Sequence, residues 1–299
     1  MKYKTALNSP KIEQVKKKRR EALIRKISIF LSFFVVCLIL LSILFRWSAI
    51  NIQNIEITGN KVVEAKDIEE AIRKDTSGNY YWLFPKTNFI FYPQNEVKNN
   101  LAQNFKRLKN ISLEVHELKK LKVEVTEREP VYTWCGYDLP PLEIKLEDSR
   151  CFFIDNEGYV FDEAPRFSGS VYFRFYGGLE GNKKSEQNED LLDNAPGSYF
   201  LKSNFAKISA FKKSISNMGL KPISLFVKPD GDIEIYLSSA MPPEGPKIIF
   251  KTDSDYEKLV DNLQTVLETE PLKTEIKTKY NSLLYIDLRF GNKVYYKFK

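Results

Sequence analysis

Hydrophobic and polar positions divide the chain into one long apolar run and many short periodic segments. The run covers residues 27–45, reads ISIFLSFFVVCLILLSILF and holds nineteen residues without a charge. As a helix it would be about 28 Å long, close to the bilayer hydrocarbon thickness of about 30 Å. A signal peptide usually has a shorter apolar region of about 7–15 residues and a small-residue cleavage site. Here Phe45, Arg46 and Trp47 close the run, so the pattern predicts an uncleaved transmembrane helix over residues 27–47.

In residues 48–129, the spacing of apolar residues predicts three strands and two helices. The expected elements are, in chain order, a strand over 50–60, helices over 64–74 and 93–105, and strands over 111–118 and 120–128. The aromatic stretch between the helices, TSGNYYWLFPKTNF, is expected to be irregular. The order β-α-α-β-β predicts a domain over residues 48–129, with two helices over one face of a three-stranded sheet.

Residues 130–299 mix strand-like runs with two amphipathic helices. The expected strands and hairpins lie at 131–135, 151–161, 170–177, 223–237, 247–250 and 285–298. One helix is predicted over 205–218, and the other opens at a capping box of Ser254 and Glu257. The polar stretch 178–199 is expected to be an exposed loop. This predicts an α+β domain, with a mixed β-sheet and two helices on one face.

The last hairpin is the most regular feature of this second domain. Gly291-Asn292 separates two alternating runs, which is typical of a two-residue turn. In the final run, Lys293, Tyr295, Lys297 and Lys299 share one face. The alternate residues Val294, Tyr296 and Phe298 should pack on the helices of the sheet. The final strand is expected at the sheet edge, where its free N–H and C=O groups could accept another strand.

Charge is concentrated at the N-terminus. The formal net charge is +7, but residues 1–26 hold ten Lys or Arg and two acids, whereas residues 27–299 hold 36 basic and 37 acidic residues. A nucleic-acid groove needs its positive charge on the folded surface, so nucleic-acid binding is not expected. Residues 1–26 are interpreted as a basic cytoplasmic tail. Its ten basic residues, against Arg46 alone just after the apolar run, predict a cytoplasmic N-terminus. With the one predicted span, the rest of the chain is then extracytoplasmic.

Candidate chemistry is sparse. The single histidine, His116, has no companion at metal-ligand spacing and is expected to face solvent. Nucleophile motifs and phosphate-binding loops are absent, and no acid pair lies in apolar surroundings. Asp287 and Arg289, two residues apart on one strand, predict a same-face ion pair. We therefore expect no catalytic, metal or cofactor site and no small-molecule substrate.

The cysteines leave one question open. Cys37 lies in the apolar run, whereas Cys135 and Cys151 lie outside it, at the ends of two runs expected to pair as a hairpin. Disulfides persist outside the cytoplasm but need Cα atoms about 5.5–6 Å apart. The two residues are therefore either a structural disulfide or two free thiols.

Several motifs in this order resemble the bacterial cell-division family called FtsQ, or DivIB in Gram-positive bacteria. They are IEITGN, Gly78-Asn79 with the aromatics nearby, LKVEVTEREPVYTW, IDNEGYVF and YIDLRFGNKVYY. The resemblance covers residues from about 27 to 299. It implies that residues 48–129 are a POTRA domain and residues 130–299 the FtsQ-type β domain.

The resemblance also implies a function and partners. It implies a non-catalytic scaffold of the divisome, in the plasma membrane at the septum, that links early and late division proteins. The sheet edge would contact FtsB-like (DivIC-like) and FtsL-like bitopic proteins by strand addition. The residues expected at that contact are Phe290, Asn292, Lys293, Val294, Tyr295, Tyr296 and Lys297. The lysines would either select an acidic partner or only guard the edge against aggregation.

Two other functional classes stay open at this point. A type II membrane-anchored envelope enzyme would need a convergent acid or metal constellation, which the sequence lacks. A POTRA-bearing scaffold of another envelope machine would share the anchor and the first domain.

Overall fold

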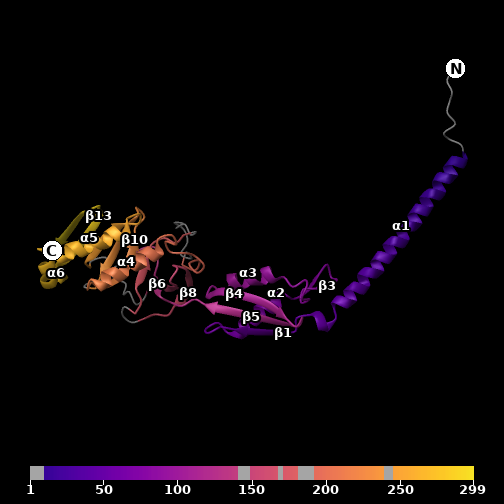
Figure 1. Ribbon diagram of the computed structural model, residues 1–299, viewed down its shortest axis with the longest axis horizontal. Coiled ribbons are helices and arrows are strands. Elements are labelled where there is room, and N and C mark those ends of the chain that lie inside the picture. Colours follow the sequence, from indigo (N-terminus) through magenta and orange to yellow (C-terminus); the bar gives the residue numbers. More distant parts are fainter. Residues whose placement is uncertain (1–9, 141–148, 168–170, 181–191, 239–244) are drawn as a thin grey trace, which may run out of the picture. The chain divides into compact units, whose positions relative to one another are not determined.

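The computed structural model describes residues 10–140, 149–167, 171–180, 192–238 and 245–299 (Figure 1). The chain divides into two compact units. The first contains Met1–Ala102 and Asn110–Thr126, and the second contains Gln103–Lys109 and Glu127–Lys299.

The first unit begins with the long helix α1 (Pro10–Phe45). Its segment Gln14–Phe45 is long and apolar enough to cross a membrane, and the apolar side chains between Ile27 and Leu44 are mostly exposed. Such exposure suits a helix surrounded by lipid, because lipid rather than protein then covers the apolar surface. The part of the chain that the structure describes holds one such helix, so the protein is a membrane protein with an N-terminal membrane helix. The helix begins at Pro10, so residues 10–26 of the basic tail are also helical.

The rest of the first unit has the predicted order β-α-α-β-β. Its main elements are β1 (Asn54–Thr58), α2 (Ala65–Asp75), α3 (Gln94–Asn104), β4 (Leu108–His116) and β5 (Lys120–Glu127). The sheet order is β1-β5-β4, with β1 parallel to β5. The isoleucine, valine and leucine positions of both helices and of β5 are buried, as their periods predict: Ile68, Ile72, Val97, Leu101, Leu121, Val123 and Val125.

The aromatic stretch between the two helices differs from the prediction. It contains a small antiparallel hairpin, β2 (Asn79–Tyr80) and β3 (Phe84–Pro85), where an irregular segment was expected. Strands of two residues are too short to show a period of two in the sequence. The first predicted strand is also shorter, because a 3-10 turn, η1 (Ser48–Ile50), precedes β1.

The second unit is built on a nine-stranded mixed sheet with the order β14-β13-β12-β11-β10-β9-β6-β7-β8. The strands are β6 (Tyr132–Trp134), β7 (Cys151–Ile154), β8 (Val160–Ala164), β9 (Arg174–Tyr176), β10 (Pro222–Val227), β11 (Asp232–Leu237), β12 (Lys247–Lys251), β13 (Leu283–Phe290) and β14 (Lys293–Phe298). Three neighbouring pairs of strands in this sheet are parallel: β6 with β9, β9 with β10, and β12 with β13.

The helices of this unit lie beside the sheet (Figure 1). Their apolar side chains and those of the sheet form one hydrophobic core. The helices are α4 (Phe205–Asn217), α5 (Tyr256–Glu268) and α6 (Leu272–Lys279), followed by a 3-10 turn, η4 (Tyr280–Ser282). The helix α6 is an addition to the two predicted helices. Leu272 is its only buried residue, so its sequence carries little helical period.

Two local predictions in this unit are wrong. The N-cap of α5 is Asp255 rather than Ser254, and its carboxylate accepts hydrogen bonds from the N–H groups of Glu257 and Lys258. Both residues are good caps, and only the backbone geometry distinguishes them. The polar stretch 178–199 is not wholly exposed, because Leu179 and Ala195 are buried in the core. Its central residues 181–191 lie outside the described part of the chain.

Candidate partner-binding surface

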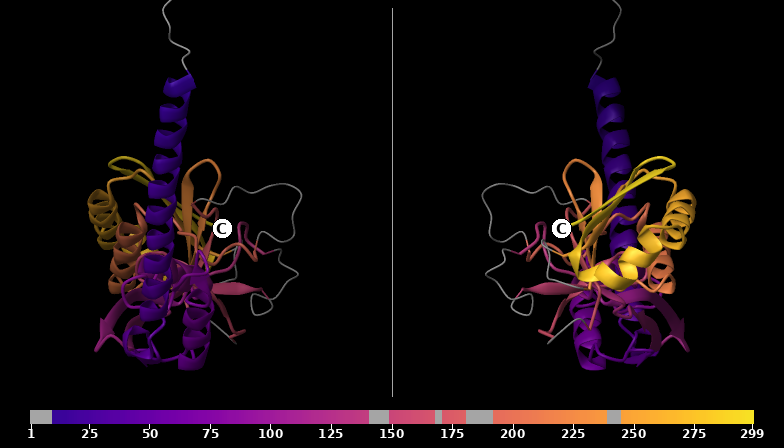
Figure 2. Two further views of the ribbon diagram at one scale, coloured as in Figure 1. Left: turned by 90° about the vertical axis from the view of Figure 1, so that its right-hand side faces the viewer. Right: turned by 90° about the vertical axis from the view of Figure 1, so that its left-hand side faces the viewer.

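Strand β14 forms one edge of the nine-stranded sheet. It pairs with β13 in antiparallel register, with Ile286 opposite Tyr296 and Phe290 opposite Lys293. Within the described residues, no strand pairs with its other side (Figure 2). Strand β14 therefore presents its outward backbone N–H and C=O groups at a sheet edge.

The turn that starts this edge strand is held in place. Gly291 has a φ of +66°, a left-handed conformation that glycine adopts without strain. Its carbonyl accepts a hydrogen bond of 2.8 Å from the Asn262 amide on α5. At the other end of the strand, the Lys299 N–H donates to the Ser282 carbonyl at 2.8 Å. Both ends of β14 are therefore fixed to the body of the unit.

The side chains of β14 alternate as predicted. Val294, Tyr296 and Phe298 are half-buried and pack against the core. On the other face, Tyr295 is 50% exposed, and its ring lies 5.2 Å from the ring of Phe290, which is 55% exposed. Lys293 and Lys297 are exposed on either side of Tyr295. The edge thus combines an exposed aromatic pair with two flanking cations.

Behind this edge, the predicted ion pair of Asp287 and Arg289 is confirmed. Arg289 donates to both carboxylate oxygens of Asp287, at 2.9 and 2.6 Å, and to Asp232 on β11 at 2.5 Å. The hydrogen bond with Asp287, more than offsetting partial burial, raises the pKa of the guanidinium. Asp232 was not expected in this cluster, because only the pairing of distant strands brings it there.

The opposite edge of the sheet, β8, is partly covered by its own chain. The Val160 N–H donates to the Ser198 carbonyl at 2.9 Å, and the Gly197 N–H donates to the Val160 carbonyl at 2.8 Å. Further along the strand, the Arg107 side chain pairs with Asp162 at 2.5 Å. The two edges of one sheet therefore differ in the backbone groups that they leave available.

The loop that leads into β8 is anchored by a buried ion pair. Arg128 lies 2.5 Å from Asp155, and their side chains are 10% and 3% exposed. The other carboxylate oxygen of Asp155 accepts the N–H groups of Glu157 and Tyr159. The guanidinium of Arg128 lies 3.8 Å from the centre of the Tyr159 ring. These contacts give the motif residues Arg128 and Asp155 a structural role.

A second buried carboxylate lies at the centre of the sheet. Glu234 on β11 receives hydrogen bonds from Tyr236, from Lys247 at 2.9 Å and from Lys228 at 2.6 Å. Burial raises the pKa of this carboxyl, but these three hydrogen bonds outweigh it, and the pKa lies below its ordinary value. The alternation of β11 indicates a polar face but gives no sign that the face is buried.

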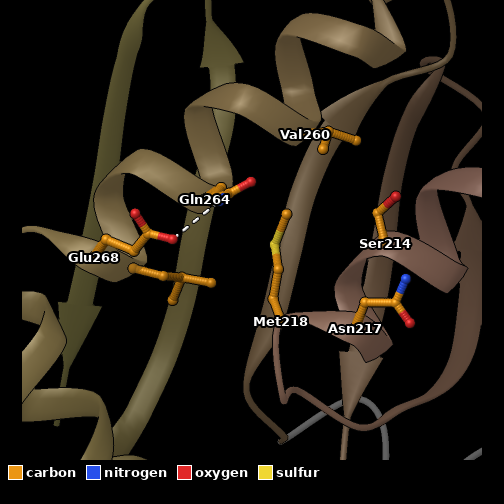
Figure 3. Close-up of a pocket in the computed structure, with 7 residues that line it drawn as sticks. Ser214, Asn217, Met218, Val260, Gln264 and Glu268 are labelled. Atoms are coloured by element: carbon orange, nitrogen blue, oxygen red, sulfur yellow. Dashed lines mark hydrogen bonds between the residues drawn. The ribbon is translucent and has the colours of Figure 1, made fainter.

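A pocket of about 390 Å³ lies between α4 and α5 (Figure 3). Its lining residues are Ser214, Asn217, Met218, Val260, Gln264, Leu267 and Glu268. Gln264 donates to Glu268 at 3.0 Å, and Glu268 is the one carboxylate among these seven residues. Because the lining lacks a second acid, a histidine and a cysteine, it offers no acid–base pair or metal-ligand set.

The remaining candidate residues have ordinary structural positions. The His116 side chain is 52% exposed, as predicted, and lies 3.4 Å from Glu114. No group of three potential metal-ligating side chains occurs in the described ranges. Cys135 and Cys151 form a disulfide with an S–S distance of 2.06 Å, next to the β6–β7 pairing, and Cys37 is a free thiol in α1.

Comparison with known proteins identifies the first unit's domain. Residues 50–128 match the family model described as "POTRA domain, FtsQ-type". None of the curated proteins matches the chain.

Proposed function

We propose that this FtsQ/DivIB-like chain, a single-span membrane protein with an FtsQ-type POTRA domain, is a non-catalytic scaffold of the bacterial divisome. Its task would be to link early and late division proteins through contacts outside the cytoplasm. The observation that carries this proposal is the open β14 edge with its exposed Tyr295 and Phe290.

Strand addition is the binding mode that suits this edge. An incoming strand would pair with the outward backbone groups of β14, and alternate side chains would provide selectivity. The register supports a specific backbone assignment. In a hairpin with a two-residue turn, the flanking residues Phe290 and Lys293 form a hydrogen-bonded pair. Alternation then turns the N–H group of Val294 away from β13, toward an incoming strand.

The side chains of the edge favour an acidic partner with an apolar residue. Tyr295 and Phe290 offer the aromatic surface that commonly dominates binding free energy. Lys293 and Lys297 would attract carboxylates on the incoming strand. The same lysines would repel the edge of a second copy, so partner selection and protection against self-pairing are compatible.

The family resemblance supplies the partners and the location of the proposal. The partners would be FtsB-like (DivIC-like) and FtsL-like single-span proteins, and the protein would act at the division septum. In this arrangement, the basic N-terminus is cytoplasmic and residues 48–299 are extracytoplasmic, as the positive-inside rule predicts. Depletion in the native cell should then give filaments without septa, whereas normal septation would contradict the division role.

The edge itself is tested by binding of the extracytoplasmic part of an FtsB-like partner to the full chain. Tyr295→Ala removes an aromatic anchor, and Val294→Pro removes an outward N–H without touching the β13 ladder. Each variant should weaken binding at least about tenfold. The control Lys207→Glu alters an exposed residue of α4 and should bind like the parent.

A charge reversal at Lys297 tests whether the lysines of β14 select an acidic partner. Lys297→Glu should weaken binding of the acidic partner, and the loss should shrink at high salt because screening weakens exposed charge interactions. Unchanged binding in Tyr295→Ala and in Val294→Pro would remove strand addition at β14 as the binding mode.

A further inference from the structure

The β2–β3 hairpin exposes two aromatic side chains at its turn. Tyr81 and Trp82 are 89% and 88% exposed, the highest values among the large hydrophobic side chains of the described residues. The Leu83 N–H closes the turn by donating to the Tyr80 carbonyl at 3.0 Å. We call Tyr81 and Trp82 the aromatic turn.

The backbone of the aromatic turn is unfavourable for these residues. Tyr81 and Trp82 have φ values of +48° and +60°, in the left-handed region. Asn and Gly adopt this conformation far more readily than bulky aromatic residues. The sequence therefore keeps large rings at a turn where small residues would fold better, which indicates a role for the rings.

The aromatic turn is attached to the end of the membrane helix. The Ser42 hydroxyl donates to the Leu83 carbonyl at 2.8 Å, and the Arg46 guanidinium donates to the Trp82 carbonyl at 2.9 Å. Next to these bonds, the Phe45 ring packs edge-on against Phe84 at 5.6 Å. Figure 1 likewise shows β3 beside the C-terminal end of α1.

Two buried amides complete this attachment. The Asn51 side chain donates to the carbonyls of Phe45, at 3.0 Å, and of Trp47, at 2.7 Å. The Asn88 side chain is fully buried and donates to the Phe45 carbonyl at 3.3 Å. The two bonds to Phe45 satisfy a carbonyl group that a helix end otherwise leaves free. The helix end and the domain therefore form one hydrogen-bonded assembly.

These contacts set the depth of the aromatic turn relative to the bilayer. Ser42 lies three residues before Phe45, which corresponds to about 4.5 Å along a helix axis. The carbonyls of Leu83 and Trp82 meet Ser42 and Arg46, on either side of the end of the apolar run. The rings of the aromatic turn thus lie at the level where the hydrocarbon meets the headgroups. Trp and Tyr are the residues enriched at that level in membrane proteins.

We propose that the aromatic turn is a membrane-docking surface that inserts Tyr81 and Trp82 into the headgroup–hydrocarbon boundary of the bilayer. Trp47 and Ile90, which are also exposed and adjoin the same helix end, extend this surface. The ligand is the lipid surface on the side of the membrane that holds the POTRA domain. This contact would keep the domain seated on the membrane and does not depend on the proposed role in division.

Depth-dependent quenching of tryptophan fluorescence tests the docking. The full chain is placed in vesicles of phosphatidylcholine that carries bromine either near the carbonyl end or near the middle of the acyl chains. A Trp47→Phe background leaves Trp82 and the buried Trp134 as emitters. We expect the shallow bromines to remove most of the Trp82 emission and the deeper bromines to remove less.

Two variants make the result specific. Tyr81→Asn with Trp82→Gly restores a favoured turn sequence, so it should fold at least as well and lose the quenchable emission. Val62→Trp, in the Trp47→Phe and Trp82→Gly background, places a tryptophan at an exposed site beyond the far end of β1 and should not be quenched. Emission of Trp82 that bromine leaves unchanged would overturn the proposal, as would equal quenching of a tryptophan at residue 62.

Discussion

The two edges of the nine-stranded sheet differ in how far other parts of the chain cover them. At the β8 edge, Val160 exchanges hydrogen bonds with Gly197 and Ser198, and Asp162 is paired with Arg107. At the β14 edge, the described chain adds no further strand and leaves Tyr295 exposed. Because an open edge invites aggregation, proteins usually cover or charge it. The difference shows that β8 is partly covered by its own chain, whereas β14 keeps the open edge at which we propose that a partner strand adds.

The largest expected effect belongs to the buried ion pair on the covered side. Asp155→Ala should lower the free energy of unfolding by about 3–5 kcal/mol, because it leaves the Arg128 guanidinium buried without its carboxylate. Urea unfolding of the full chain in detergent, followed by near-UV circular dichroism, measures this. Asp261→Ala, at an exposed site on α5, is the control and should change the value by at most about 0.5 kcal/mol. A loss as small as that of the control would contradict the assigned structural role.

The disulfide on the same side should have the next largest effect. Replacing Cys135 and Cys151 by serine should lower the free energy of unfolding by about 3 kcal/mol, given their sequence separation of 16 residues. A reducing agent should destabilise the parent by a similar amount and leave the double variant unchanged. Two reactive thiols outside the membrane in the native, oxidised protein would show that this bond is absent.

Alanine substitutions at two turn glycines, one near each edge, compare how tightly the two turns are packed. A Cβ atom at Gly158, in the β7–β8 turn, would meet the Phe200 carbonyl and the Phe205 ring at 2.8 Å, whereas one at Gly291 would meet nothing within 4 Å. Both glycines have a positive φ. Gly158→Ala should cost about 2–4 kcal/mol and Gly291→Ala about 1–2 kcal/mol, both measured by urea unfolding. Equal costs would mean that the two turns are packed alike.

The smallest expected change in stability is that of Glu234 at the centre of the sheet, and it appears only at acidic pH. Because the pKa of Glu234 lies below its ordinary value of 4.5, its ionised carboxyl stabilises the fold above that pH. This contribution is lost as the pH falls through the lowered pKa. Glu234→Gln should therefore flatten the acid side of the stability profile, whereas Glu70→Gln, exposed on α2, should not. Identical profiles in the parent and in Glu234→Gln would contradict the assignment.

The sequence predicts the elements whose side chains alternate between a core and solvent. The anchor, the β-α-α-β-β domain and the final hairpin follow from long apolar runs or from regular periods. Alternation alone predicts that Val294, Tyr296 and Phe298 lie on the inner face of β14, and they pack there. Alternation suffices because a strand on one core has only one way to bury every second residue.

The features that the sequence could not supply depend on contacts between distant residues. The helix α6 has a single buried residue, and the hairpin of β2 and β3 is too short to show a period. Asp232 reaches Arg289 only because β11 and β13 both pair with β12. The aromatic stretch TSGNYYWLFPKTNF predicts only an irregular segment, and its position beside the end of α1 follows from the hydrogen bonds to Ser42 and Arg46.

The side-chain amides of Asn51 and Asn88 at the end of α1 have a consequence for rotation. Since they bond to the carbonyls of Phe45 and Trp47, turning α1 about its axis turns the first unit by the same angle. The rotation of α1 about its own axis in the bilayer thus sets the direction, in the plane of the membrane, toward which each face of that domain points. One alanine inserted in α1 before Ser42 would shift this direction by about 100° and leave the hydrogen bonds made by Ser42, Asn51 and Asn88 in place.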